Sequence, residues 1–218
     1  FILTQVGDIL DRQEIEWDLF IIYLMSMRMD RVMSFNRPFS LKVVCSILNT
    51  MNYRYVMILE PHSERTKGLL GTRCYPQKFN FESHLDIQSN IVFPDAGAYQ
   101  RYKILSNNWG HIVFNKVRDL ETGKIREFSI GREVNCYYPT FTFIDDLCDA
   151  GGTFLGELKV LKERYPDAKY EIMVCHAVNI KGLVNLCNNF DRVIITNSYC
   201  DCGYKPSNNN LTVIDVCG

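Results

Sequence analysis

Short runs of β-branched and aromatic residues alternate with amphipathic stretches along this chain, and this alternation limits the possible folds more than any other feature. The strand-like runs lie at 53–59, 90–93, 111–115, 140–144, 171–175, 192–196 and 211–216. Between them, apolar residues recur at helical spacing at 39–51, 152–165 and 180–190. Nearly continuous apolar strands separated by helices indicate parallel sheets that are covered on both faces. We therefore predict an α/β, doubly wound fold.

The composition narrows the class of protein. Hydrophobic residues make up 47% and charged residues 22% of the 218 residues, which is ordinary for a globular chain and excludes a disordered, collagen-like or coiled-coil protein. The longest apolar runs, such as 19–25, are much shorter than the roughly 18–20 residues of a membrane span. The charges of the 24 basic and 25 acidic residues nearly cancel. We therefore expect no membrane or nucleic-acid partner, and any anion must be bound by a local site.

Nine cysteines are present, and several, such as Cys45 and Cys175, lie within apolar runs where a thiol behaves as a small buried group. At this chain length the pattern indicates a reduced, cytoplasmic protein rather than a disulfide-stapled one. Cys200 and Cys202 have no second Cys/His pair at zinc spacing, so we interpret them as a surface loop. The chain starts at Phe1 within an apolar stretch, and we expect that part of the native amino terminus precedes it.

Two polar stretches interrupt the alternation. The segment 62–88 has little periodicity, and we predict that it connects two similar halves, 1–84 and 85–218. The segment 116–138 is rich in basic residues, and its residues 121–124 (ETGK) are typical of a hairpin turn. We interpret this second stretch as a lid or flap that excludes water from a site.

The segment 141–153 (FTFIDDLCDAGGT) carries the most distinctive chemistry. An apolar strand leads to Asp145 and Asp146, and a glycine turn then opens a helix. Gly151 and Gly152 allow a tight turn with free amides, and the helix start and the Thr153 hydroxyl complete a cradle for a phosphate. The two carboxylates are placed to accept hydrogen bonds from sugar hydroxyls. The simpler alternative is that the acids cap the helix and the glycines only turn the chain.

Three further strand ends carry polar groups: Asp95 follows 91–94, His62 follows Glu60 and Pro61, and Lys116 and Arg118 follow Phe114. Ligands of parallel α/β sheets collect at the carboxyl ends of strands, so these groups are candidates for one site. Each also has a simpler interpretation. Asp95 can cap the next helix, a lone histidine is usually structural, and basic residues such as Arg28 and Arg37 can belong to a solvated loop.

Five segments, in this order, resemble the phosphoribosyl pyrophosphate synthetases. The segment 27–42 resembles Y-A-R-Q-D-R…R-x-P-I-S-A-K, 59–63 resembles a strand ending in D-L-H, and 91–98 (IVFPDAGA) resembles V-S-P-D-A-G-G. Residues 114–119 resemble the K-x-R that opens the family's mobile catalytic loop. Residues 141–153 resemble the phosphoribosyl-pyrophosphate loop, which type I phosphoribosyltransferases share. The resemblance implies two similar type I phosphoribosyltransferase-like halves, the first of them incomplete at its amino terminus.

The resemblance also implies an activity and its residues. The reaction is transfer of the β,γ-diphosphate of ATP to the anomeric hydroxyl of ribose 5-phosphate. The implied residues are Arg28, Asp30, Arg37 and His62 for ATP; His62 and Asp95 for Mg²⁺; Asp145, Asp146, Asp149, Ala150, Gly151, Gly152 and Thr153 for ribose phosphate; and Lys116, Arg118 and His62 for catalysis. The implied cofactor is Mg²⁺, and the implied assembly is a homo-oligomer, either a dimer or a hexamer.

Some positions depart from the family pattern. Ala150 stands where the family usually has threonine, and Met29, Glu60 and Pro61 also differ. These departures resemble a divergent, phage-type branch linked to NAD metabolism, which would act in the host cytoplasm and whose acceptor is ADP-ribose. Two other hypotheses stay open: a phosphoribosyltransferase, which needs no ATP site, and a non-catalytic regulatory homologue.

Overall fold

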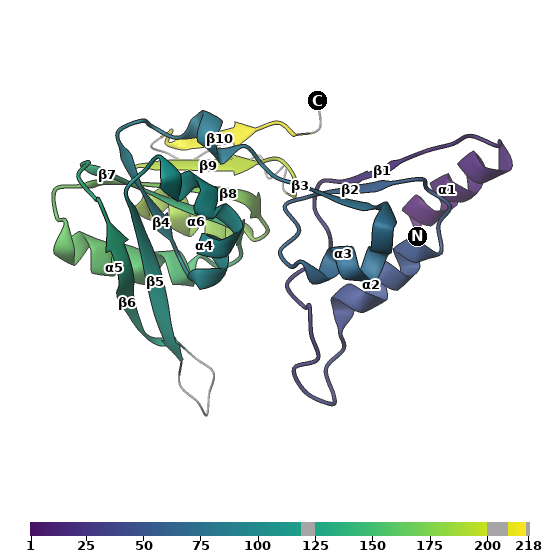
Figure 1. The fold of residues 1–218 in the computed structure, drawn as a ribbon, viewed down its shortest axis with the longest axis horizontal. Coiled ribbons are helices and arrows are strands. Elements are labelled where there is room, and N and C mark those ends of the chain that lie inside the picture. Colours follow the sequence, from purple (N-terminus) through teal and green to yellow (C-terminus); the bar gives the residue numbers. More distant parts are fainter. Residues whose placement is uncertain (119–124, 200–208, 217–218) are drawn as a thin grey trace. The chain divides into compact units, whose positions relative to one another are not determined.

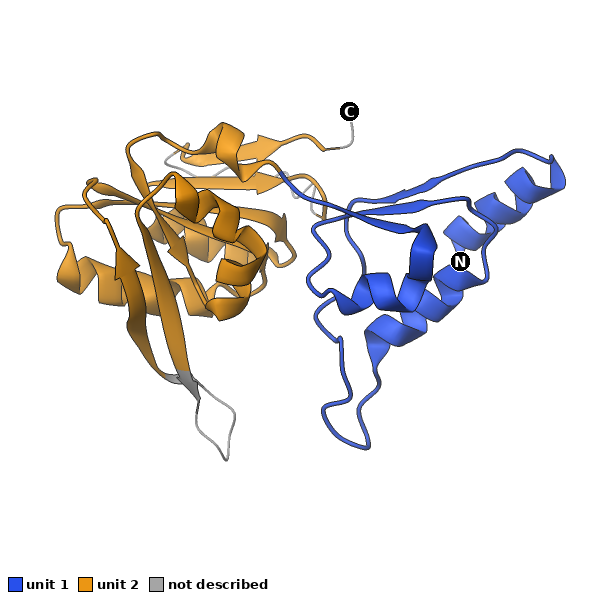
Figure 2. Ribbon diagram, in the orientation of Figure 1, with its two compact units in different colours: residues 1–79 blue, residues 80–218 orange. Residues whose placement is uncertain are grey.

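The computed structural model describes residues 1–118, 125–199 and 209–216, and for residues 117, 118, 125 and 126 it describes only the backbone. The chain forms two compact units, Phe1–Phe79 and Asn80–Gly218 (Figure 2). No disulfide joins the cysteines within the described ranges. The pair at 200 and 202 and the turn at 121–124 lie outside these ranges. None of the helices described is long and apolar enough to cross a membrane.

The first unit contains a three-stranded parallel sheet in the order β1-β2-β3. Its elements are α1 (Ile2–Arg12), β1 (Leu19–Ile21), α2 (Ser40–Asn49), β2 (Val56–Leu59), α3 (Arg65–Leu70), a 3₁₀ turn (Gly71–Arg73) and β3 (Cys74–Gln77). The helix predicted at 39–51 is present as α2, and it buries Leu41, Cys45 and Leu48 at helical spacing.

The segment 62–88 contains the division between the two units, at 79/80, but it is not only a connector. This segment contains α3 and β3, and Cys74 of β3 is the register partner of Val56. Only Cys74 of β3 is buried, and Pro76 lies within the strand. The strand lies at the edge of its sheet, where proline is tolerated and one face is solvated. The segment therefore lacks the apolar run by which the other strands were predicted.

The second unit contains a seven-stranded sheet in the order β10-β9-β8-β7-β4-β5-β6, in which β5 and β6 are antiparallel and all other neighbours are parallel (Figure 1). Its elements are a 3₁₀ turn (Phe81–His84), β4 (Ser89–Phe93), α4 (Ala96–Tyr102), a 3₁₀ helix (Lys103–Asn107), β5 (His111–Arg118), β6 (Ile125–Val134), β7 (Thr140–Cys148), α5 (Gly152–Arg164), β8 (Lys169–Ala177), α6 (Ile180–Asn189), β9 (Arg192–Thr196) and β10 (Leu211–Ile214). The predicted α/β class with helix-flanked parallel sheets is confirmed.

Helices cover both faces of this sheet. Val92 of β4 belongs to a buried core that includes Phe154 and Leu158 of α5 and Leu186 of α6. The next residue, Phe93, meets the Tyr99 ring of α4 edge to face, at 5.4 Å between ring centroids. Because successive side chains of a strand point to opposite faces, α4 lies on one face and α5 and α6 lie on the other. The helices that follow the neighbouring strands β4 and β7 therefore diverge, which is the topological switch point where such sheets bind ligands.

Two strands are longer than their apolar runs predict. β7 continues through Asp145 and Asp146 to Cys148, and β5 continues past Phe114 to Arg118. Both extensions are held by neighbours, since Leu147 pairs with His176 of β8 and Lys116 pairs with Phe128 of β6. The polar stretch at 116–138 thus contains a β-strand, β6, whose ladder with β5 supports the basic residues.

Candidate active site

Asp95 lies at the carboxyl end of β4, at the switch point. Its Oδ1 accepts a hydrogen bond from the Ala98 amide at 2.9 Å and caps α4. Its Oδ2 accepts one from Lys116 Nζ, also at 2.9 Å. Burial raises the pKa of Asp95, but Lys116, the Ala98 amide and Arg101 outweigh it, so the net shift in pKa is downward. Asp95 is therefore an ionised, 42% exposed carboxylate, and the helix-cap role is present together with an ion pair.

Lys116 projects from the extension of β5 towards Asp95. Its side chain is 13% exposed, and its ammonium group pairs with Asp95 at 2.9 Å and with Glu157 of α5 at 3.9 Å. Lysine is a compact point charge on a flexible stem, which suits it to neutralise a phosphate. Arg118 ends the same strand, but its side chain lies outside the described part of the structure.

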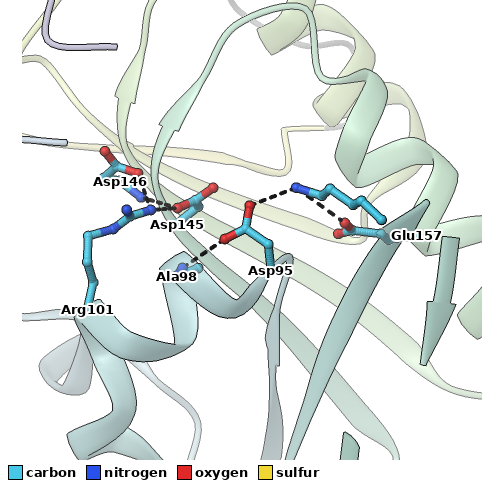
Figure 3. Close-up of polar contacts among 7 residues, drawn as sticks. Asp95, Ala98, Arg101, Asp145, Asp146 and Glu157 are labelled. Atoms are coloured by element: carbon cyan, nitrogen blue, oxygen red, sulfur yellow. Dashed lines mark hydrogen bonds and ion pairs between the residues drawn. The ribbon is translucent and has the colours of Figure 1, made fainter. Parts of the chain in front are cut away.

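Asp145 and Asp146 share one cation, Arg101 of α4. Arg101 Nη2 donates to Asp145 Oδ1 at 2.8 Å and to Asp146 Oδ1 at 2.9 Å (Figure 3). Burial and the neighbouring Asp146 raise the pKa of Asp145 well above the usual value, although Arg101 opposes the shift. Burial lowers the pKa of Arg101, but the two carboxylates outweigh it and raise that pKa. The site therefore holds two carboxyl groups whose charge one guanidinium does not fully compensate.

Glu157, like Arg101, belongs to this site but was not predicted from the sequence. It lies on α5 and is fully buried, and within the described part of the chain neither carboxyl oxygen has a hydrogen-bond partner. Burial, with smaller contributions from Asp95 and Asp145, raises its pKa to about 9, although Lys116 opposes the shift. At neutral pH the Glu157 carboxyl is thus protonated.

The glycine turn follows β7 directly. Gly151 has φ +80° and precedes the first residue of α5, which has no side-chain cap. A side chain at Gly152 would have no heavy atom within 4 Å, so the start of α5 is open there. The Ala150 carbonyl accepts from Asn185 at 3.1 Å, and an Asp149 carboxyl oxygen accepts from Asn179 at 3.2 Å. The turn is held from behind by α6 and its cap, with the Gly152 side left free.

In the first unit, Asp30 ties two loops together. Arg65 of α3 donates to the Asp30 carbonyl at 3.0 Å, and the Asp30 side chain hydrogen-bonds Arg31 and Ser63. Burial raises the pKa of Asp30, but these hydrogen bonds outweigh it, and the net shift in pKa is downward. His62 immediately precedes Ser63, so Asp30 and the His62 loop are neighbours. Arg28 and Arg37 are exposed on the loop between β1 and α2.

The predicted residues of the second unit thus gather at one edge of its sheet. They form two ion-paired sets, Lys116 with Asp95 and Arg101 with Asp145 and Asp146, and the turn from Asp149 to Thr153 follows the same strand as the two aspartates. Arg101 and Glu157 join them from helices on opposite faces of the sheet. Glu157 left a detectable signal, because it interrupts the apolar stripe of α5 formed by Phe154, Leu158 and Leu161. Arg101 left none in the apolar pattern.

Within the described ranges, no three His, Cys, Asp or Glu residues are arranged to hold a metal ion by themselves. A full protein cage is not required for Mg²⁺, which is commonly bound by one or two carboxylates together with substrate phosphates. The ionised and partly exposed Asp95 fits that type of ligand.

The fold and site define a doubly wound α/β domain with a glycine turn at the start of α5 and a Lys–Asp ion pair at its topological switch point. Its described residues share this architecture with the crystal structure of phosphoribosylpyrophosphate synthetase from Mycobacterium smegmatis, with a TM-score of 0.71 over 97% of this chain and 71% of that chain. Sequence identity in that superposition is 18%, so it establishes the fold.

A curated relative extends the likeness to sequence. The chain is 24% identical over 182 residues to "Ribose-phosphate pyrophosphokinase" of Mycoplasmopsis pulmonis (strain UAB CTIP). The match covers 78% of this chain and only 56% of the relative's length. No protein-family model matches the chain. The resemblance to the phosphoribosyl pyrophosphate synthetases that the five motifs predict is confirmed, and the proteins it resembles are named as diphosphate-transferring enzymes.

Proposed function

We propose that this chain carries out ATP-dependent diphosphate transfer: the anomeric hydroxyl of a ribose 5-phosphate unit attacks the β-phosphorus of ATP, and AMP leaves. The observation that supports this most directly is the Lys116–Asp95 pair beside the two aspartates and the open glycine turn. A cation for a transferring phosphate, a carboxylate for a metal and a cradle for a sugar phosphate are the elements that this reaction needs.

In the second unit, the amides of Gly151 and Gly152 and the Thr153 hydroxyl hold the 5-phosphate at the start of α5. Asp145 and Asp146 accept hydrogen bonds from the ribose hydroxyls, replacing part of their pairing with Arg101. Asp149 and Ala150 complete the turn. Lys116 and Arg118 stabilise the negative charge that grows on the transferred group.

In the first unit, Arg28, Arg37, Asp30 and His62 contribute to ATP binding. Arginine's planar fork suits contact with phosphate or stacking on adenine. The Asp30 interactions with Arg65 and Ser63 hold the His62 loop, which supports this assignment. Such chemistry needs no covalent intermediate, because positioning and electrostatics supply most of the rate.

In the second unit, Asp95 would hold Mg²⁺ together with the phosphates of ATP, and the resemblance to the synthetases implies His62 of the first unit as a further metal residue. When bound, it would neutralise charge on the phosphates and polarise the reacting phosphoryl group. Asp95 retains its negative charge at neutral pH, since its pKa is lowered, and is therefore ready to bind a cation.

AMP release from ATP and Mg²⁺, with ribose 5-phosphate as acceptor, tests the proposal. Release that depends on the acceptor supports diphosphate transfer. Exchange of a base on a preformed activated sugar, without ATP, would instead indicate a phosphoribosyltransferase. ATP binding without turnover would indicate a regulatory homologue.

A second acceptor is favoured by one feature of the turn. Residue 150 is alanine, so this turn offers one hydroxyl fewer than the family pattern. A diphosphate ester such as ADP-ribose presents less charge at that position than a terminal phosphate monoester. Offering ribose 5-phosphate and ADP-ribose separately decides between them. Turnover with ADP-ribose would point to a product, ADP-ribose pyrophosphate, that serves NAD resynthesis, whereas turnover with ribose 5-phosphate only would remove this branch.

A further inference from the structure

A buried acid without a hydrogen bond stands out on α5. The other buried side chains of this helix, Phe154, Leu158 and Leu161, are apolar and pack into the core of the second unit. Glu157 is buried among these positions, yet no described residue forms a hydrogen bond with either of its oxygens. An apolar residue there would avoid the penalty of burying an unsatisfied carboxyl, so packing alone does not explain a glutamate.

Among the described side chains, the cation that pairs with this acid is Lys116, and the backbone fixes their approach. Phe128 of β6 lies directly opposite Lys116 of β5, and paired residues of antiparallel strands project on the same face. The Phe128 ring occupies the space where a side chain at Gly156 would lie. Glycine at 156 therefore lets α5 lie against β6, and the next residue, Glu157, comes within 3.9 Å of Lys116 Nζ.

We propose that Glu157 is a positioning residue for Lys116: it is the second carboxyl partner that holds the ammonium group over the carboxyl end of β5 when Asp95 is engaged elsewhere. The assignment rests on the proposed function, in which Asp95 takes up a cation of its own. Lys116 would otherwise lose its 2.9 Å partner at the moment when its position matters most.

The charges around the acid agree with such an exchange. Lys116 is the cation that faces Glu157, while Asp95 from the β4–α4 junction and Asp145 from β7 are the anions that act on it. One ammonium group cannot fully neutralise two carboxylates. In this structure the charge of an ionised Glu157 would be poorly compensated, and the pKa of Glu157 is raised. Once Asp95 binds another cation, the Lys116 ammonium group can pair with Glu157 instead.

The first test follows Lys116 itself and needs no turnover. The acylation rate of Lys116 by an amine-reactive ester is measured by peptide mass spectrometry in the full chain. The variants are Asp95→Asn, Glu157→Gln and both together. Asparagine retains the helix cap at 95, and serine provides a second version if that protein does not fold. The acylation rate of each variant is expressed as a fold-change relative to wild type. If Glu157 holds Lys116 when Asp95 cannot, the fold-change of the double variant exceeds about twice the product of the two single-variant fold-changes. A rate at or below that value overturns the proposal.

The second test uses kinetics. Glu157→Gln keeps the shape of the side chain and should lower kcat for AMP release about five-fold or more, with KM for ATP nearly unchanged. Glu163→Gln, on the exposed face of the same helix, is the matched control and should leave kcat as it is. A smaller loss in Glu157→Gln, or an equal loss in both variants, contradicts a positioning role. If wild-type protein releases no AMP with either acceptor, the proposed function fails, while the acylation rates still decide the role of Glu157.

Discussion

Replacing Arg101 with methionine should destabilise the second unit strongly at neutral pH and much less in acid. Arg101 is the partner that Asp145 and Asp146 share, and Asp146 is fully buried. Methionine preserves most of the apolar length of the side chain and removes the charge. Both carboxyl groups then remain at the switch point without their cation.

The magnitude follows from the two hydrogen bonds, at 2.8 and 2.9 Å, that join Arg101 to ionisable partners. A hydrogen bond to a charged group contributes about 1.5–3 kcal/mol, and breaking a buried ion pair costs about 3–5 kcal/mol. Because burial and Asp146 already raise the pKa of Asp145, that carboxyl can retain a proton, and only part of the penalty applies. We expect a loss of about 3–4 kcal/mol in the free energy of unfolding at about pH 7.5.

The sign of the pH dependence is fixed by linkage. Arg101 opposes the rise in the pKa of Asp145, so its removal raises that pKa further, and the folded variant binds more protons than the folded wild type. The penalty is therefore fully present above the raised pKa of Asp145. It shrinks as pH falls through that pKa towards the unfolded value of about 3.9.

The two tryptophans allow each unit to be followed separately. Trp17 packs against Tyr53 in the first unit, and Trp109 donates to the Asp86 carbonyl at 3.2 Å in the second. In a Trp17→Phe background, the fluorescence of Trp109 during urea unfolding reports the second unit alone. Curves at about pH 7.5 and about pH 5 give the loss of stability and its pH dependence.

Arg164→Met is the matched control, because Arg164 pairs with Glu133 at 2.7 Å but is 54% exposed. Exposed ion pairs contribute little to stability, so this variant should unfold nearly as wild type does. Equal losses in the two variants, or a loss in Arg101→Met that does not shrink in acid, would refute the reasoning. Adding Asp146→Asn to Arg101→Met should recover part of the lost stability.

Three further outcomes can be checked. Burial raises the pKa of Glu157 to about 9, so the fold favours the protonated carboxyl. The stability from this protonation is fully present below the unfolded pKa of about 4.3 and is lost as pH rises through about 9. In urea unfolding, the free energy of unfolding of Glu157→Gln should therefore increase relative to wild type as pH rises across this window. Lys116→Ala should lower kcat about 10³-fold while calorimetry gives a nearly unchanged ATP affinity, and an equal loss of binding would argue for a simple binding role. A side chain at Gly182 would overlap the Asp149 carbonyl, so Gly182→Ala should lower the melting temperature by several degrees and weaken binding of ribose 5-phosphate, whereas Gly68→Ala, with no atom in the way, should not.

Some elements followed directly from the amino-acid pattern. The run predicted at 192–196 is β9, and the helix predicted at 180–190 is α6, because both are apolar and bounded by polar residues. β3 was not predicted, since it is exposed at a sheet edge, and β6 was expected only as part of a hairpin because it lies in a polar stretch. The helix expected after residue 94 is α4, but its seven residues are too few to show a period.

The same division applies to the candidate site. Asp95, Lys116, Asp145 and Asp146 each follow an apolar run, so strand order alone brings them to one edge. The partners that set their charge come from the covering helices, and no strand rule places those side chains. Arg101 is on a helix with no clear apolar stripe, whereas Glu157 could have been found as an acid within one.

The close passage of α5 over β6 at Gly156 restricts how this protein can diverge. Any larger residue at 156 would meet Phe128 and lift the helix, which would move the neighbouring acid away from its amine. Natural variation at 156 and 157 should therefore be correlated. Lineages that retain glutamate at 157 must retain glycine before it, and a lineage that loses the acid is released from that restriction.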